Sequence, residues 1–123
     1  MSALFGRSEE KVAQDEAARA EGERLAALAP ADLAVEVLPA FAAENVEPHV
    51  HSSLMACKFL MSSFPKGTRI PAKDLDPPVR SALQQLLNAG LLMERAQPNR
   101  PPRMYITPLG ETALSAGDVR RYL

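Results

Sequence analysis

The chain has 123 residues, of which 46% are hydrophobic and 24% charged, a composition that predicts one domain with a buried core and excludes a wholly disordered chain. Its net charge is −1, yet residues 1–57 carry 4 Lys and Arg against 10 Asp and Glu, whereas residues 58–123 carry 10 against 5. Any contact with a polyanion is therefore expected in the second half of the chain, although charged helices can also simply solvate themselves. Aromatic residues make up only 5% and Trp is absent, which favours helices over a β-sandwich.

No apolar run approaches the roughly 20 residues that cross a bilayer, and the N-terminus lacks a long apolar signal segment. We therefore expect a cytoplasmic protein that makes no contact with a membrane. The single cysteine, Cys57, cannot form an internal disulfide, and its apolar neighbours indicate a buried thiol rather than a nucleophile.

The first segment of the chain is charged and helical in character. Residues 8–29 are rich in Ala, Glu and Arg and contain no proline, so they are expected to form a helix. Its larger apolar residues are Val12, Leu25 and Leu28. Because this apolar stripe is weak, we expect residues 1–29 to be an extension outside the core, followed by one domain over residues 30–123.

Two further helices are expected before the middle of the chain. Pro30 is well placed to begin the first, and Pro39 should end or kink it. After a polar connector at residues 44–48, the apolar spacing predicts a helix over residues 50–64 that Pro48 can open. Its apolar face consists of Val50, Leu54, Cys57 and Met61. A turn then leads to residues 68–70, for which we expect a short edge strand.

The next helix has clear start and stop signals. Asp76 can cap it, Pro77 can occupy its first position, and Gly90 can end it in a left-handed conformation. The residues expected on its buried stripe are Val79, Leu83, Leu86 and Leu87. The opposite face, with no acidic residue, consists of Arg80, Ser81, Gln84, Gln85 and Asn88.

A hairpin and a capped helix complete the chain. Residues 91–95 and 103–107 alternate well enough to pair as strands, and the prolines of the loop at residues 96–102 discourage regular strand there. Thr107 can cap a helix that begins at Pro108 and stops at Gly117. Asp118 can cap a last turn over residues 119–123.

Two strings of residues carry a family resemblance: LQQLLNAGLL at residues 83–92 and RMYITPLG at residues 103–110. Together with the element order over roughly residues 50–117, they resemble the winged-helix superfamily, especially bacterial regulators of the multiple-antibiotic-resistance and phenolic-acid repressor groups. The resemblance implies a mainly α fold with a small β-hairpin wing, an α+β winged-helix domain behind an N-terminal helical extension. It also implies a DNA-binding transcriptional regulator without enzymatic activity.

The resemblance makes the polar face of the helix after Asp76 a recognition helix and the hairpin a wing. Arg80 would then contact a phosphate or a guanine, and the amides would contact adenine edges or the DNA backbone. Wing arginines would enter a minor groove or pair with phosphates, and the basic residues before the helix would add backbone contacts. The expected DNA-binding residues are Lys66, Arg69, Lys73, Arg80, Ser81, Gln84, Gln85, Asn88, Arg95, Asn99, Arg100 and Arg103.

One departure supports an alternative function. Only residues 71–76 lie between the expected strand and the recognition helix, which leaves about one turn for a positioning helix. Some winged helices bind proteins instead of DNA, so a protein-interaction module, as an adaptor or a complex subunit, is the second hypothesis. A homodimer through the weak N-terminal helix and residues 119–123 is also expected, as in similar regulators.

No cofactor, metal or catalytic chemistry is expected. His49, His51 and Cys57 match no common zinc spacing, and a fourth ligand is not evident. The chain has no Gly-rich phosphate loop, nucleophile elbow or convincing acid/base pair, so we expect no enzyme activity.

Overall fold

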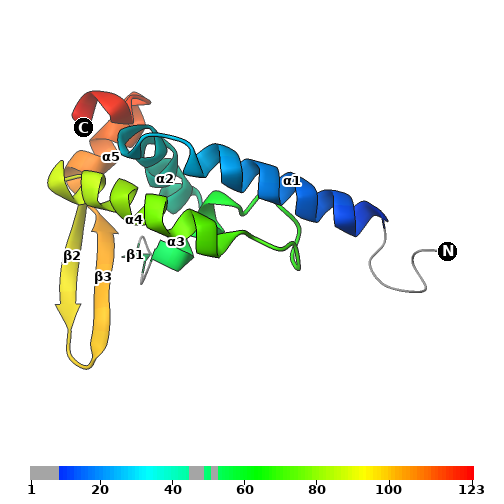
Figure 1. Ribbon diagram of the computed structural model, residues 1–123. Helices are drawn as coiled ribbons and strands as arrows, with labels where there is room; N and C mark the ends of the chain where they lie inside the picture. Colours follow the sequence, from blue (N-terminus) through cyan, green and yellow to red (C-terminus); the bar gives the residue numbers. More distant parts are fainter. Residues whose placement is uncertain (1–8, 45–48, 51–52) are drawn as a thin grey trace.

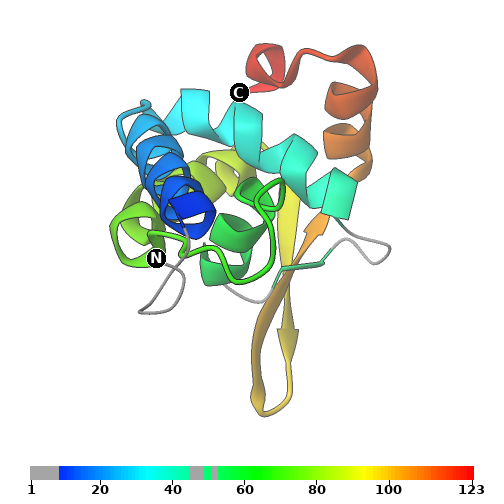
Figure 2. The ribbon, with the colours of Figure 1, turned by 90° about the vertical axis from the view of Figure 1, so that its right-hand side faces the viewer.

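The computed structural model describes residues 9–44, 49–50 and 53–123, which are mainly helical and carry a small antiparallel sheet (Figures 1 and 2). This winged-helix-like α+β arrangement is the expected fold class. The elements are, in chain order, α1 (Glu9–Ala26), α2 (Pro30–Glu44), β1 (His49–Val50), α3 (Ser53–Leu60), α4 (Ala72–Asn88), β2 (Leu92–Gln97), β3 (Arg100–Ile106), α5 (Pro108–Ala116) and the 3-10 turn η2 (Val119–Tyr122). The expected connector and its Pro48 lie mainly outside the described residues.

The third strand of the sheet lies before α3, not after it. The sheet order is β1-β3-β2, with His49 opposite Tyr105 and Val50 opposite Met104. The prediction of one helix over residues 50–64 was therefore wrong at its start, because Val50 pairs in the sheet. The expected strand at residues 68–70 is absent as well, since the amide of Arg69 donates to Asp15 Oδ1 of α1 at 2.9 Å rather than to a strand.

Helix α4 begins at Ala72, four residues before the expected cap Asp76. Pro77 and Pro78 lie inside it, so the carbonyls of Lys73 and Asp74 lose their helical donors. Both of these residues are exposed, so water can hydrate the carbonyls. The expected one-turn positioning helix at residues 71–76 is thus mostly part of α4, and the helix that precedes α4 is α3. The order α2-β1-α3-α4 therefore places a separate helix before the one that was expected to recognise DNA.

The core lies between α4 and the helices packed on it. Val79, Leu83 and Leu86 of α4 are buried as the apolar stripe predicted, and Leu87 is half-buried. Leu75, which precedes the expected start of the helix, is buried as well. Helix α2 contributes the fully buried Leu33, Val37, Leu38 and Phe41, and it continues through the exposed Pro39 to Glu44 instead of ending there. Phe41 meets Phe59 of α3 edge to face, with ring centroids 5.9 Å apart.

Helix α1 belongs to this core, contrary to the expectation of an extension outside it. Ala18 and Gly22 are buried, and Leu25 is only 2% exposed. Arg24 adds a polar link to α2, with its Nη2 2.8 Å from Glu36 Oε1. The residues proposed for a dimer surface are partly used within the chain too, because Val119 of η2 is 4% exposed and joins the same core. Homodimer formation itself remains a prediction.

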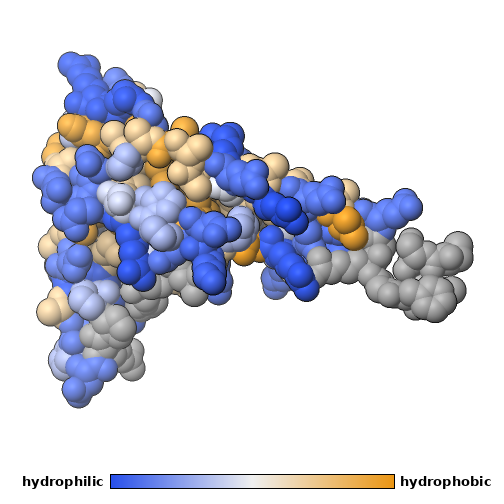
Figure 3. Space-filling model, viewed as in Figure 1, coloured by the Kyte–Doolittle hydropathy of each residue, from blue (hydrophilic) through white to orange (hydrophobic). Residues whose placement is uncertain are grey.

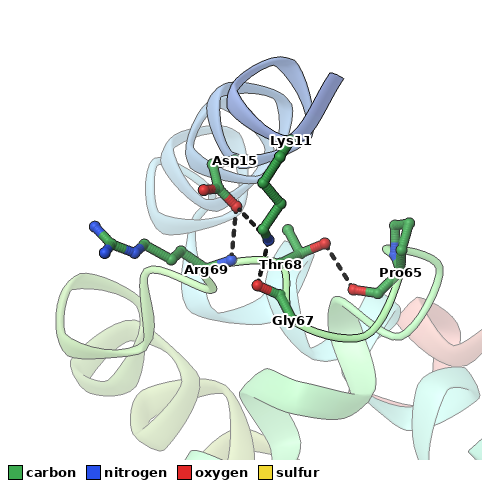
Figure 4. Close-up of polar contacts among 6 residues, drawn as sticks. All are labelled: Lys11, Asp15, Pro65, Gly67, Thr68 and Arg69. Carbon is green, nitrogen blue, oxygen red and sulfur yellow. Dashed lines mark hydrogen bonds and ion pairs between the residues drawn. The ribbon is translucent and has the colours of Figure 1, made fainter. Parts of the chain in front are cut away.

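The N-terminal half of α1, which projects in Figure 1, is tied to the loop between α3 and α4 (Figure 4). Lys11 Nζ lies 3.1 Å from Asp15 Oδ1 and also donates to the carbonyl of Gly67. Asp15 in turn accepts from the amide of Arg69, and Thr68 closes the loop by donating to the Pro65 carbonyl at 2.6 Å. These bonds explain why the loop can follow α1 without forming a strand.

The strands of the wing, the hairpin of β2 and β3, extend beyond their expected ends. Arg95 pairs with Arg103 and Gln97 with Arg100, so Ala96 opposes two residues, Pro101 and Pro102. The strand thus includes the prolines that were expected to discourage it, because a bulge tolerates residues that cannot donate to the ladder. β1 pairs with β3 at Met104 and Tyr105, on the C-terminal side of this bulge.

The two strings that carry the family resemblance meet at the base of the wing. Gly90 (φ +77°) ends α4, and the amide of Leu91 bonds the Leu86 carbonyl at 3.0 Å. Thr107 caps α5 by accepting from the amide of Gly110 at 3.0 Å, and its own amide donates to the Leu91 carbonyl at 3.1 Å. A Cβ on Gly110 would lie 2.3 Å from that carbonyl oxygen. These residues therefore fix the wing to α4.

The expected start and stop of α5 are present, but the expected side-chain cap of the last turn is not. Helix α5 begins at Pro108 and is followed by Gly117 (φ +68°). The last turn, η2, follows Asp118, whose side chain makes no capping hydrogen bond.

Cys57 is the buried thiol that its apolar neighbours predicted. Its side chain is 0% exposed on α3, and burial raises the pKa of the thiol to about 11, with the negative charge of Asp76 acting in the same direction. The neutral thiol is thus the stable form in the folded protein.

The close approach of α1 to the start of α4 makes Gly22 sensitive to substitution. A Cβ at Gly22 would lie 2.3 Å from Pro71 Cγ, so Gly22→Ala should lower the free energy of unfolding by about 1–3 kcal/mol, although the same change in an open helix is stabilising. Denaturant unfolding checks this, with Glu23→Ala at an exposed neighbour as control. The double variant Gly22→Ala/Pro71→Ala should lose less than the two single losses added together; strict additivity would contradict the packing argument.

Burial of the Cys57 thiol should appear in the pH dependence of stability. Between pH 9 and about 11 the unfolded chain releases this proton while the folded chain retains it, so the free energy of unfolding falls as pH rises, by roughly 3 kcal/mol in total. Cys57→Ala should remove this part of the slope. Urea titrations of both proteins from pH 8 to 11 measure it, and identical slopes would show that the thiol is not protected.

Candidate nucleic-acid interface

A groove about 560 Å³ in volume runs between α4 and one face of the wing. Its floor is apolar and its rim polar. The lining residues are Ser53, Arg80, Leu83, Gln84, Leu87, Glu94, Pro102 and Met104. The groove thus brings together the start of α3, the polar face of α4 and the middle of the wing, which lie far apart in the sequence.

The polar face of α4 is as the sequence predicted. Arg80, Ser81, Gln84, Gln85 and Asn88 are all exposed, because the buried stripe of the same helix fixes its rotation. Gln84 Nε2 donates to Asn88 Oδ1 at 2.8 Å, one helical turn away. This pair holds two amides side by side, and each retains donors or acceptors for a ligand.

Arg80 is held by two residues that the sequence interpretation did not assign to the site. Its Nε lies 2.8 Å from Asp76 Oδ2 and 3.2 Å from Ser53 Oγ. Ser53 also donates to the other carboxylate oxygen of Asp76, so the three side chains form a closed cluster. Because α4 begins before Asp76, this residue stands one turn before Arg80 instead of capping the helix.

Two acidic residues reduce the net positive charge of this surface. The face of α4 was expected to carry none, but Asp76 pairs with Arg80 and the exposed Glu94 of β2 lines the groove. The reason is positional. Asp76 joins the face because α4 starts early, and Glu94 reaches it because the wing folds back beside the helix.

The wing does not present Arg95 and Arg103 to the groove. Side chains alternate along each strand, and Glu94 and its partner Met104 line the groove, so Arg95 and its partner Arg103 lie on the opposite face of the hairpin. The Arg95 guanidinium is 5.4 Å from the centroid of the Tyr105 ring. Arg95 and Arg103 therefore form a second surface, separate from that of Arg80.

The remaining predicted residues lie at the tip of the wing, in the loop before α4 and in the first turn of α4. Asn99 (φ 57°) is in the exposed tip, where Arg100 begins β3. On the face seen in Figure 3, the hairpin is covered mainly by hydrophilic residues.

Three exposed basic residues lie on the α1 side of α4 or in its first turn. Lys66 and Arg69 are in the loop after α3, and Arg69 lines a second hollow, of about 370 Å³, that includes Asp15 and Arg19 of α1. Lys73 is seven residues before Arg80 on α4, about 10 Å along the helix axis. Only Lys73 thus shares an element with the groove.

Sequence reasoning assigned Arg80 and Gln84 to the site but missed the other residues that line the groove: Ser53, Leu83, Leu87, Glu94, Pro102 and Met104. It also missed Asp76, which pairs with Arg80. The i,i+4 spacing of Asp76 and Arg80 was a usable signal, since such pairs form ion pairs on a helix. No local pattern pointed to Ser53, which reaches the cluster only because α3 packs on α4.

The residues considered for a metal do not assemble into a site where the structure describes them. Residues 9–44, 49–50 and 53–123 contain no group of three His, Cys, Asp or Glu side chains that could hold an ion, and His51 lies outside these ranges. Among the same residues, no helix is both long and apolar enough to span a membrane.

Comparison with protein-family models, curated proteins and solved structures finds no match for this chain. The winged-helix-like fold therefore rests on the order and packing of its own elements.

Proposed function

We propose that this protein binds double-stranded DNA through α4 and the wing and acts as a transcriptional regulator without enzymatic activity. The observation that carries the proposal is the order of α3, α4 and the wing, with a uniformly polar face on α4. A helix about 10–12 Å wide fits the major groove of B-DNA, where Arg and amide side chains recognise base edges. We place this activity in the cytoplasm.

Different surfaces have different roles in this proposal. Arg80, Gln84 and Gln85 of α4 face the bases and the flanking phosphates, and the wing tip at Asn99 and Arg100 follows the backbone. Arg95 and Arg103, on the outer face of the hairpin, contact phosphates of a neighbouring segment. Lys73 adds a backbone contact at the start of α4, and Lys66 and Arg69 contribute charge from the preceding loop.

A protein-interaction module is the second candidate, and the lining of the groove favours it. Leu83, Leu87, Pro102 and Met104 give the groove an apolar floor, and Glu94 stands at its rim. An amphipathic segment with a basic residue would match this pattern. The same groove would then hold a partner peptide instead of flanking a DNA backbone.

The DNA proposal predicts a salt-dependent affinity that particular arginines control. In fluorescence anisotropy with a mixed-sequence duplex, log K should fall with log salt at about −0.9 per phosphate contact. Arg80→Ala should make this slope less steep by about 0.9, and replacing Arg95, Arg100 and Arg103 together should reduce it further. Arg121→Ala, an exposed arginine at the C-terminal end, is the matched control. Absence of binding even at low salt would refute the proposal.

Glu94→Lys separates the two candidate functions. A positive charge at the rim of the groove should strengthen duplex binding at low salt by about tenfold and add about one contact to the salt slope, if DNA lies there. If the groove instead holds a basic segment of a partner, the same variant should bind no duplex and should no longer copurify with that partner. Thermal unfolding of the variant confirms that the exposed change leaves the fold intact.

A further inference from the structure

Arg80 is anchored at one nitrogen of its guanidinium. Its side chain is 72% exposed, whereas the Asp76 side chain is 23% exposed and Ser53 is 8% exposed. Both anchors are thus more buried than Arg80, whose guanidinium extends from them toward solvent. Asp76 and Ser53 can therefore hold the Arg80 side chain in place while its guanidinium stays exposed to a ligand.

The anchoring bonds involve only the inner nitrogen of the guanidinium. Nε donates to Ser53 Oγ at 3.2 Å and lies 2.8 Å from Asp76 Oδ2. Within the described part of the chain, no hydrogen bond or ion pair of Arg80 involves Nη1 or Nη2. The two terminal nitrogens, which can form the paired bonds to a guanine edge or a phosphate, therefore remain available.

The supports come from two different helices. Asp76 is on α4, one turn before Arg80, and Ser53 is the first residue of α3. The Ser53 hydroxyl donates to Asp76, so it fixes the carboxylate that fixes the arginine. A rigid support of this kind lowers the conformational entropy that a long side chain loses on binding.

We propose that Ser53 and Asp76 are positioning residues that hold Arg80 by its Nε, so that its Nη1 and Nη2 are presented to duplex DNA. This inference rests on the proposed function and assigns to α3 a direct part in recognition. The negative charge of Asp76 also repels the phosphates of DNA. Ser53 and Asp76 thus favour a contact of fixed orientation by Arg80 over nonspecific electrostatic attraction to DNA.

A double-mutant cycle tests the role of Ser53. Ser53→Ala changes no charge, and it should weaken binding of a mixed-sequence duplex by about threefold to tenfold at low salt, the loss expected for one hydrogen bond. In the Arg80→Ala background the same change should have no effect, because its target is gone. Ser115→Ala, an exposed serine on α5, is the matched control. An equal loss in both backgrounds, or none in either, would overturn the proposal.

Asp76→Asn tests the second support in the same cycle. Removing the negative charge should strengthen binding in both backgrounds, but the gain should be about threefold to tenfold smaller where Arg80 is present, because the support is weakened there. A larger gain with Arg80 present would show that Asp76 restrains the arginine, and would overturn its positioning role.

The two levels of the hypothesis fail in different ways. If the unmodified protein binds no duplex at low salt, the proposed function fails. If it binds and Arg80→Ala reduces its salt slope, but the cycles show no coupling to Ser53 or Asp76, only the positioning role fails. Thermal unfolding of every variant separates both results from a loss of structure.

Discussion

Packing against the apolar face of α4 is the constraint on which the other elements depend. Helices α1, α2 and α3 all contact this helix. The buried Leu75, Val79 and Leu86 are each worth about 1.5–3 kcal/mol when removed from water. Because this burial fixes the rotation of α4, it also turns the polar face of Arg80, Ser81, Gln84, Gln85 and Asn88 outward.

The position of the wing follows from the end of the same helix. Leu91, the first residue after Gly90, is fully buried, and its carbonyl accepts from the Thr107 amide beyond the hairpin. Both strands of the wing are therefore anchored where α4 stops. The face that meets the groove then follows from alternation along the strands, and it carries Glu94 and Met104 instead of Arg95 and Arg103.

The groove combines an arginine, the acidic Glu94 and an apolar floor, and Asp76 pairs with that arginine, so its recognition properties differ from those of a purely basic surface. Charge alone attracts any polyanion, whereas a paired arginine contributes mainly through its orientation. The Ser53-Asp76-Arg80 cluster is consistent with recognition that depends on geometry. The outer arginines of the wing, by contrast, suit contacts that depend chiefly on charge.

The sequence by itself determined the features that local chemistry specifies. The buried stripe and polar face of α4 follow from helical spacing, and Gly90, Thr107 and Gly117 end or cap their helices through bonds to near neighbours. The hairpin and the buried thiol of Cys57 were predicted for the same reason. Only the tertiary structure decided the pairing of His49–Val50 with β3, the packing of Gly22 on Pro71 and the meeting of Ser53 with Asp76 and Arg80. These contacts join residues far apart in the chain, so no local propensity or spacing encodes them, and they form only when α4 brings the surrounding elements together.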